Sequence, residues 1–88
     1  MSGYFEYDTY QKGYKPFVLN KENVLANKGK RIVYLLKCDY DGYRGYMFPR
    51  HSTLHDMRYS QVIIDNGNDS FDKRDVLDIG IELGEEHE

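Results

Sequence analysis

The sequence predicts a small, mainly all-β domain. Its densest apolar run, residues 31–38, is apolar at odd and even positions alike, which is typical of a strand buried on both faces. Residues 76–83 alternate apolar and polar side chains, as a strand with one solvated face does. Asn66-Gly67 is a strong hairpin signal because both residues tolerate positive φ. With 88 residues, the chain is long enough for one domain with a modest core.

Residues 1–28 are expected to form an N-terminal aromatic arm and a short helical turn. The alternation of tyrosine and polar residues over Tyr4–Tyr10 is typical of an edge strand, whereas Gly13 and Pro16 interrupt regular structure. An ordered arm packed on the sheet is favoured over a free aromatic tail. Asn20–Gly29 predicts the helical turn, with Asn20 as its N-cap and Gly29 at the C′ position.

The central segment predicts two antiparallel strands. Arg31–Cys38 and Tyr43–Arg50 would be joined by the turn Asp39–Gly42. Gly45 inside the second strand indicates a bend, a bulge or a close backbone approach. Pro49 is expected to end the hydrogen-bonded pairing because it has no amide hydrogen.

Three further strands are expected after a polar loop. His51–Arg58 is predicted to be that loop, with one helical turn as the alternative, and Tyr59–Asp65 to be the third strand. A short strand at Ser70–Asp72 and a tight turn at Lys73–Asp75 lead to the last strand, Val76–Leu83.

These elements suggest one domain with three parts: the arm (1–28), a five-stranded sheet (29–83) and an acidic tail (84–88). Gly42 and Gly67 are both expected at positive φ, where glycine has no steric penalty. Seven apolar residues are predicted to form one core: Val33, Leu35, Val62, Ile64, Leu77, Ile79 and Ile81.

The N-terminus and the single cysteine suggest a cytoplasmic protein. The first ten residues lack the basic start and apolar stretch of a secretory signal. No window approaches the roughly 18 consecutive apolar residues of a membrane span. Cys38 excludes an intramolecular disulfide, which fits a reducing compartment, and its place at the end of an apolar strand predicts an inert buried thiol.

Charge is unevenly distributed along the chain, although the net charge is only −3. Residues 12–58 hold ten basic and four acidic residues, whereas residues 59–88 hold nine acidic and two basic residues. Either a surface with two opposite poles results, which would steer a partner, or folding interleaves the two sets.

No catalytic, metal or cofactor pattern stands out. Asp39–Gly42 is similar to the start of an EF-hand loop, but Arg50 occupies the position of the closing glutamate, so a hairpin turn is favoured. His51 and His55 have the spacing of two metal ligands on a helix, but two ligands specify little and an exposed loop is favoured. Pairing Cys38 with either histidine as nucleophile and base is disfavoured by the expected burial of the thiol. We therefore expect a protein that is not an enzyme and needs no cofactor.

The segment Gly29–Met47 resembles a KOW-type motif of the SH3-like small barrels. It has a glycine ahead of an apolar strand and then Gly42-x-x-Gly45 leading into Met47. Phe71–Ile79 is similar to the short strand, 3₁₀ turn and last strand that close such barrels. The resemblance implies a five-stranded SH3-like barrel that binds nucleic acid or a nucleic-acid-handling machine. The composition, rich in tyrosine, lysine and asparagine, resembles that of bacteriophage accessory proteins.

Tyrosines and cations crowd around this motif. Aromatic rings offer stacking faces and cations contact phosphates, which is the chemistry of RNA or single-strand binding. Tyr40 and Tyr43 are expected to be exposed and Tyr46 to be a half-buried sheet residue, while Asp39 and Asp41 would repel phosphate. The candidate nucleic-acid-binding residues are Lys30, Arg31, Lys37, Tyr40, Tyr43, Arg44 and Arg50.

A protein-binding inhibitor or adaptor is the alternative hypothesis. It would bind a host protein, in the bacterial cytoplasm if the chain is phage-encoded, through the aromatic arm or an acidic face. The candidate residues of that face are Asp72, Asp75, Asp78, Glu82, Glu85 and Glu86.

Overall fold

Six strands form one antiparallel sheet in the computed structural model, which describes residues 13–83. Their order across the sheet is β1 (Tyr14–Pro16), β8 (Val76–Glu82), β2 (Arg31–Leu36), β5 (Arg50–Arg58), β6 (Gln61–Ile64) and β7 (Asp69–Asp72). A separate two-stranded ribbon pairs β3 (Tyr40–Asp41) with β4 (Tyr46–Met47). The helical elements are α2 (Lys21–Ala26) and the 3₁₀ turns η1 (Lys37–Asp39), η2 (Asp65–Gly67) and η3 (Lys73–Asp75).

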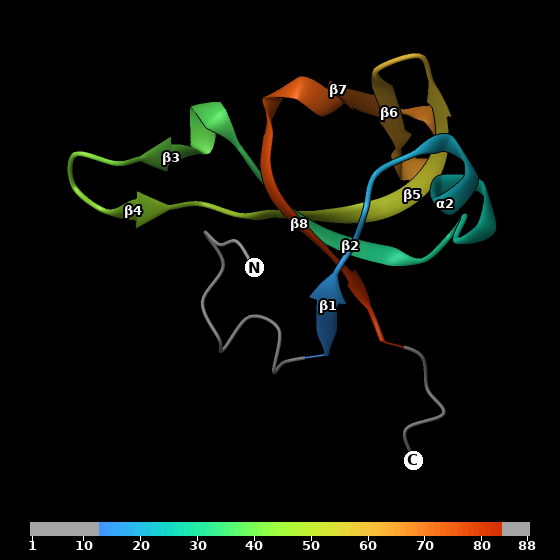
Figure 1. Ribbon diagram of the computed structural model, residues 1–88, viewed down its shortest axis with the longest axis horizontal. Coiled ribbons are helices and arrows are strands. Elements are labelled where there is room, and N and C mark those ends of the chain that lie inside the picture. Colours follow the sequence, from blue (N-terminus) through green and yellow to red (C-terminus); the bar gives the residue numbers. More distant parts are fainter. Residues whose placement is uncertain (1–12, 84–88) are drawn as a thin grey trace.

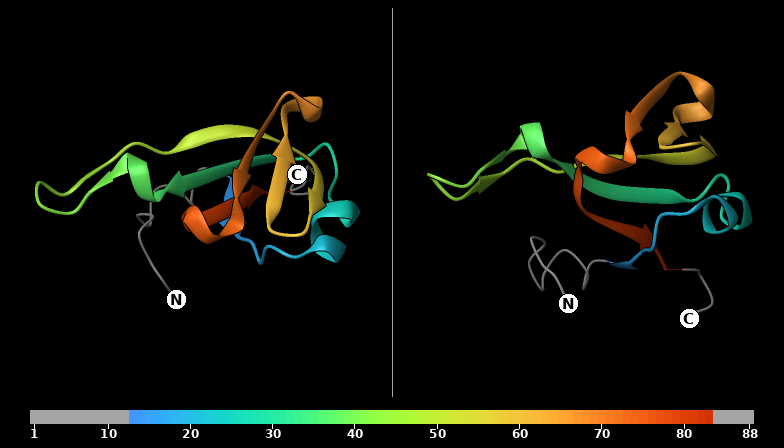
Figure 2. Two further views of the ribbon diagram at one scale, coloured as in Figure 1. Left: turned by 90° about the horizontal axis from the view of Figure 1, so that it is seen from above. Right: turned by 45° about the horizontal axis from the view of Figure 1, so that its top comes forward.

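The sheet is curved but open. β6 and β7 turn away from the plane of β8 and β2, and β1 and β7 are edges that do not pair with each other (Figures 1 and 2). The mainly β class is therefore confirmed. A closed barrel is not formed, because the described strands end in two separate edges.

Strand β2 lies between β8 and β5, and every residue after its first is buried. Ile32 and Tyr34 point to one face, whereas Val33 and Leu35 point to the other. The prediction of a central strand that is buried on both faces is thus confirmed.

The apolar residues form two clusters, one on each face of β2, so the predicted single core is wrong. The smaller cluster contains Val33 and Leu35, against which Leu77 packs. Leu77 joins it because the pairing of β2 with β8 shifts register between Leu35 and Leu36. The larger cluster contains Leu19, Val24, Ile32, Tyr34, Leu36, Leu54, Met57, Val62, Ile64, Phe71, Ile79 and Ile81.

Helix α2 covers part of the larger cluster and confirms the predicted helical turn. The Asn20 side chain accepts a hydrogen bond of 2.7 Å from the Asn23 amide, and Val24 is fully buried. The C-cap is Asn27, so residue 28 occupies C′ and Gly29, predicted there, lies one residue later. Gly29 does adopt a positive φ, of 90°. The Gly29 amide donates to the Leu54 carbonyl at 2.8 Å, which ties the end of this segment to β5.

Strand β5 replaces the polar loop predicted at His51–Arg58. It pairs with β2 on one side and β6 on the other. The backbone of its polar residues thus hydrogen-bonds to these two strands, whose backbone groups would lack these partners if the segment were a loop. Its two buried side chains, Leu54 and Met57, are three residues apart because the pairing with β6 shifts register between Leu54 and Asp56. This bulge breaks the period of two by which a strand is recognised in a sequence.

The connection between β2 and β5 also differs from its prediction. After η1 the chain continues outward as β3, and the turn lies at residues 42–45 rather than at Asp39–Gly42. Gly45 is in this turn at φ +77°, whereas Gly42 is outside the positive-φ region, so the prediction for Gly42 is wrong. Cys38 is exposed in η1, not buried at the end of a strand.

The first described strand, β1, includes Pro16, which was expected to interrupt regular structure. β1 is an edge strand that pairs with β8 on one side only, so a residue without an amide hydrogen is tolerated there. Tyr4–Tyr10 and the tail residues Glu85 and Glu86 lie outside the described residues.

The hairpin signal Asn66-Gly67 is confirmed, since β6 and β7 pair on either side of η2. Asp65, Asn66 and Gly67 have φ values of 56°, 57° and 92°. Val62 and Ile64 are buried in the larger cluster, as predicted.

Truncation of a buried residue tests the two clusters. Ile79→Ala in the larger cluster and Leu35→Ala in the smaller one should each lower the free energy of unfolding by about 2–5 kcal/mol. Leu25→Ala, at a half-exposed position of α2, should change it by less than about 0.5 kcal/mol. Urea denaturation followed by circular dichroism measures all three. A Leu35→Ala effect no larger than that of Leu25→Ala would contradict the second cluster.

The turn at Gly67 can be tested by two substitutions that differ in backbone preference. A Cβ there would meet the His55 ring at 3.7 Å, an ordinary contact, so the penalty comes from the backbone and not from crowding. Gly67→Val should lower the melting temperature, whereas Gly67→Asn should lower it less because asparagine tolerates positive φ. Equal melting temperatures for the two variants in a thermal scan would show that this backbone preference is unimportant.

Candidate interaction site on the finger

Residues 40–48, which comprise β3, the turn, β4 and Phe48, form a ribbon that we call the finger. It projects away from the six-stranded sheet in both Figure 1 and Figure 2. Three large apolar side chains are exposed on it: Tyr43 (97%), Phe48 (60%) and Tyr46 (54%). The rings of Tyr46 and Phe48 contact each other edge to face, with centroids 6.2 Å apart.

The finger is held in shape by its own backbone and by two aspartates. The Asp41 carboxylate accepts hydrogen bonds from the amides of Tyr43 (3.1 Å) and Arg44 (3.2 Å) and so closes the turn. The Phe48 amide donates to the Asp39 carbonyl at 3.0 Å. These contacts define the conformation of the residues that carry the three rings.

At the base of the finger, Arg50 forms a two-pronged ion pair with Asp39. Nε and Nη2 of Arg50 lie 2.7 and 3.1 Å from the two carboxylate oxygens. The hydrogen bonds and the charge of Asp39 raise the pKa of Arg50 above its ordinary value. Bidentate geometry makes this pair stronger than an ordinary surface ion pair.

The predicted exposure of the tyrosines is confirmed only for Tyr43. Tyr40 is partly buried, because it packs with Met47 against the smaller cluster at the base of the finger. Tyr46, expected to be a half-buried sheet residue, is instead among the exposed apolar side chains. Phe48 was not among the predicted site residues. Its position beside Pro49, which lies between β4 and β5 and outside both strands, was the signal that it could point to solvent.

The predicted nucleic-acid-binding cations lie at three places. Lys37 and Arg44 are on η1 and the finger, and Arg44 Nε is 4.0 Å from Asp41. Arg31 and Arg50 border a cleft between β5 and the β6–β7 hairpin. Lys30 precedes β2 at the end that faces away from the finger. Lys37 follows Arg31 by six residues of extended chain, roughly 20 Å at about 3.3 Å per residue, which exceeds the Debye length of about 8 Å.

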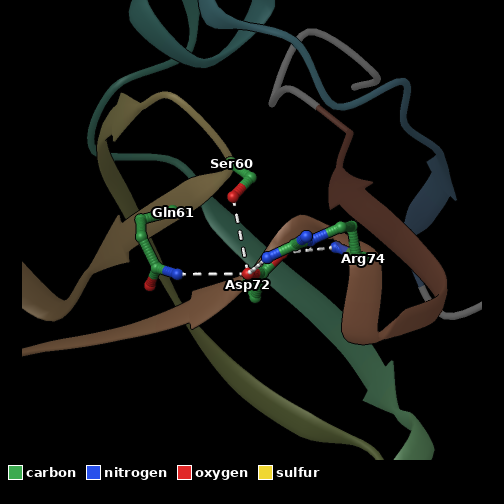
Figure 3. A network of polar contacts seen from close by, with 4 residues as sticks. All are labelled: Ser60, Gln61, Asp72 and Arg74. Carbon is green, nitrogen blue, oxygen red and sulfur yellow. Dashed lines mark hydrogen bonds and ion pairs between the residues drawn. The ribbon is translucent and has the colours of Figure 1, made fainter.

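Among the predicted acidic residues, Asp72 is the centre of a polar network (Figure 3). Its carboxylate accepts from Arg74 Nη2 at 2.7 Å and from the Arg74 amide at 2.8 Å. Ser60 and Gln61 donate to it at 3.4 and 3.3 Å. The side-chain hydrogen bond from Arg74 holds the pKa of Asp72 far below its usual range, and the hydrogen bond from the Arg74 amide and the positive charge of Arg74 lower it further. Asp72 thus connects β6, β7 and η3.

The other acidic candidates are spread over two elements. Asp75 is exposed in η3, whereas Asp78 and Glu82 are partly buried on β8. β8 pairs with β2 at residues 76–81 and with β1 at residues 80–82, so Asp78 has a paired strand only on the β2 side and Glu82 only on the β1 side.

The histidines and the cysteine do not form a site in residues 13–83. His51 and His55 lie on an extended strand, so four residues separate them by roughly 13 Å at about 3.3 Å per residue, not by one helical turn. His51 Nδ1 is 3.5 Å from the Tyr14 hydroxyl. No group of three acidic, histidine or cysteine side chains gathers in this part of the chain, and no helix in it has the length and apolar character to span a membrane.

Acidification tests the Asp72 network. Folding lowers the pKa of the Asp72 carboxyl. Its ion pair therefore stabilises the fold fully at pH values above the unfolded-state pKa, which is about 4, and this stabilisation is lost progressively as the pH falls below that pKa. Asp72→Asn should therefore lower the melting temperature clearly at pH 7 and by much less at pH 2. Asp75→Asn, at a neighbouring carboxylate without an ion pair in residues 13–83, should have the smaller effect at pH 7. A pH-independent effect of Asp72→Asn would contradict the assignment.

The finger is thus the part of the described chain where aromatic rings, a held backbone and projection from the sheet coincide. The remaining exposed large apolar side chains are scattered over other elements: Val18, Leu25, Tyr59 and Leu83. Comparison of the chain with protein-family models, with curated proteins and with solved structures finds no match.

Proposed function

We propose that the protein is a non-enzymatic binding module that docks onto a partner protein through its finger. The observation that carries this proposal is the joint exposure of Tyr43, Tyr46 and Phe48 on one projecting ribbon. Grouped apolar surface in water is unfavourable and marks interaction sites. Tyrosine is among the residues enriched in the hot spots that supply most of the binding energy of protein interfaces.

The geometry of the finger favours tight binding because little ordering is required. Its turn is closed by Asp41 and its base is held by the Asp39–Arg50 pair. Tyr40 and Met47 pack against the smaller cluster and anchor the ribbon to the sheet. Each side chain or loop that is already ordered reduces the entropic cost of association.

The charges of the finger favour a protein over a nucleic acid. The cations near the finger are Lys37, Arg44 and Arg50. Arg50 is bound to Asp39 and Arg44 lies beside Asp41, so two of these three cations have a carboxylate next to them. Those carboxylates would face any phosphate that approached. Nucleic acid remains the second candidate because the fully exposed ring of Tyr43 adjoins Arg44, a combination suited to base stacking beside a phosphate contact.

We also propose that the sheet is a variant of the SH3-like barrel. The strand order β8-β2-β5-β6-β7 and the 3₁₀ turn η3 before the last strand support this assignment. The KOW-like segment Gly29–Met47 then spans β2 and most of the finger. In such a fold the finger would be the long connection between the first two strands of the barrel, and loops of this kind commonly carry binding residues.

A capture experiment with nuclease treatment tests the proposed function. The full chain, immobilised and exposed to a bacterial lysate, should retain a protein partner after nuclease treatment. The double variant Tyr43→Ala/Phe48→Ala should weaken binding of the purified partner about 30-fold or more, because interface hot spots contribute about 2 kcal/mol or more. Surface plasmon resonance measures the change.

Tyr59→Ala is the matched control, because Tyr59 is fully exposed but lies in the β5–β6 turn outside the finger. It should leave affinity unchanged, and all variants should keep the wild-type circular dichroism spectrum. Nuclease-sensitive capture, together with binding to single-stranded DNA that weakens steeply with salt, would replace the protein partner with nucleic acid.

A further inference from the structure

A cleft of about 410 Å³ lies between the β2–β5 part of the sheet and the β6–β7 hairpin, separate from the finger. Tyr34 contributes to its wall from β2, Arg50 and Ser52 from β5, and Asp65 and Asp69 from the two ends of the hairpin loop. We call it the Tyr34 cleft. Its volume is within the range of about 300–1,000 Å³ that is typical of ligand sites.

Tyr34 is a buried residue with an unused polar group. Its side chain is only 4% exposed, and its ring stacks on Phe71 with centroids 4.5 Å apart. Its hydroxyl has no hydrogen-bond partner in residues 13–83. Every fully buried side-chain oxygen or nitrogen in these residues does have a partner, so the Tyr34 hydroxyl oxygen must be in contact with solvent. The hydroxyl therefore opens into the cleft that Tyr34 lines.

The charges around the hydroxyl are unevenly neutralised. Asp65 and Asp69 form no ion pair within the described residues. Among residues 13–83, the Asp69 carboxylate accepts a hydrogen bond only from the adjacent Ser70 amide, at 2.8 Å. Arg50, by contrast, is already bound to Asp39 through Nε and Nη2. Free negative charge thus faces the cleft on the hairpin side.

The pKa of the Tyr34 hydroxyl reflects the charged groups that line the cleft. Burial raises the pKa of its hydroxyl, Arg50 opposes that rise, and Asp69 and Asp39 add to it. At neutral pH the group is therefore a hydroxyl that both donates and accepts hydrogen bonds.

We propose that the Tyr34 cleft binds a cationic nitrogen group, an ammonium or a guanidinium, between the carboxylates of Asp65 and Asp69 and the oxygen of the Tyr34 hydroxyl. Charge-assisted hydrogen bonds from the ligand would satisfy all three acceptors. Arg31 also lines the cleft, and its backbone lies three residues along β2 from Tyr34, roughly 10 Å at about 3.3 Å per residue.

An anionic ligand fits the cleft less well. Arg31 could contact it, since Arg31 lines the cleft and forms no ion pair within residues 13–83, but Arg50 has its Nε and one terminal nitrogen committed to Asp39. The anion would also approach the two unpaired carboxylates of Asp65 and Asp69. Phosphate is therefore the informative opposing probe.

Titration of the ¹⁵N-labelled full chain by NMR tests the proposal with three probes: agmatine, the capped peptide acetyl-Gly-Arg-Gly-amide, and inorganic phosphate. Agmatine or the peptide should give saturable shifts at the amides of residues 64–69 and 50–53. The tighter of these two shows whether the cation comes from a small amine or from a peptide side chain. Saturable binding of phosphate alone, or no saturable shift with either cation, would overturn the proposal.

Two conservative variants and a control assign the effect to the named groups. Asp65→Asn removes charge but suits the backbone, since Asp65 is at φ 56° and asparagine tolerates that region, and it should weaken binding about tenfold. Tyr34→Phe keeps the ring on Phe71 and should weaken binding about threefold through loss of the hydroxyl. Asp75→Asn, in η3 outside the cleft, should leave affinity unchanged. An equal loss in Asp75→Asn would show non-specific charge attraction and would overturn the site.

Discussion

The burial of strand β2 on both faces is the constraint on which the rest of this molecule depends. A single strand with Ile32 and Tyr34 on one face and Val33 and Leu35 on the other needs apolar partners in two directions. On one side α2, β6, β7 and β8 supply them, which explains why the sheet curves around the larger cluster. On the other side, residues from β1, β3, β4 and the beginning of β8 pack into a second, smaller cluster. The base of the finger is thereby packed against the smaller cluster, whereas the turn at its tip is exposed.

The ion pair between Arg50 and Asp39 lies where these parts meet. Arg50 is opposite Tyr34 in the ladder of β2 and β5, and Asp39 ends η1, just before the finger begins. The pair joins the two chains at the point where the large sheet gives way to the small ribbon. One guanidinium thus contributes to the base of the finger and to the wall of the Tyr34 cleft. Its commitment to Asp39 leaves both surfaces with less free positive charge than the sequence suggests.

The parts of the fold that were predicted correctly have short-range causes. The buried strand β2, the cap at Asn20 and the Asn66-Gly67 hairpin each depend on the residues of their own segment. The errors arise where pairing partners decide the outcome. Strand β5 was missed because a bulge places Leu54 and Met57 three residues apart, and only its two neighbouring strands make its polar residues extended. The Tyr34 cleft could not be found either, since Asp65 and Asp69 approach Tyr34 only after the hairpin has folded back over the sheet. Tyr43 could be predicted as exposed because it adjoins a turn, and Phe48 had a signal in the neighbouring Pro49, but Tyr46 could not be predicted because the position of that turn was wrong.

The uneven charge of the sequence is partly neutralised by local ion pairs in the folded chain. Three arginines of the basic segment pair with aspartates of the same segment: Arg44 with Asp41, Arg50 with Asp39, and Arg58 with Asp56. In the acidic segment, Arg74 occupies Asp72 in the same local way. Each of these pairs neutralises charge locally, although the net charge of each segment stays the same. Long-range attraction is also screened beyond about 8 Å at physiological salt. The two surfaces on which we propose that recognition depends are the exposed aromatic rings of the finger and the Tyr34 cleft, where Asp65 and Asp69 form no ion pair within residues 13–83.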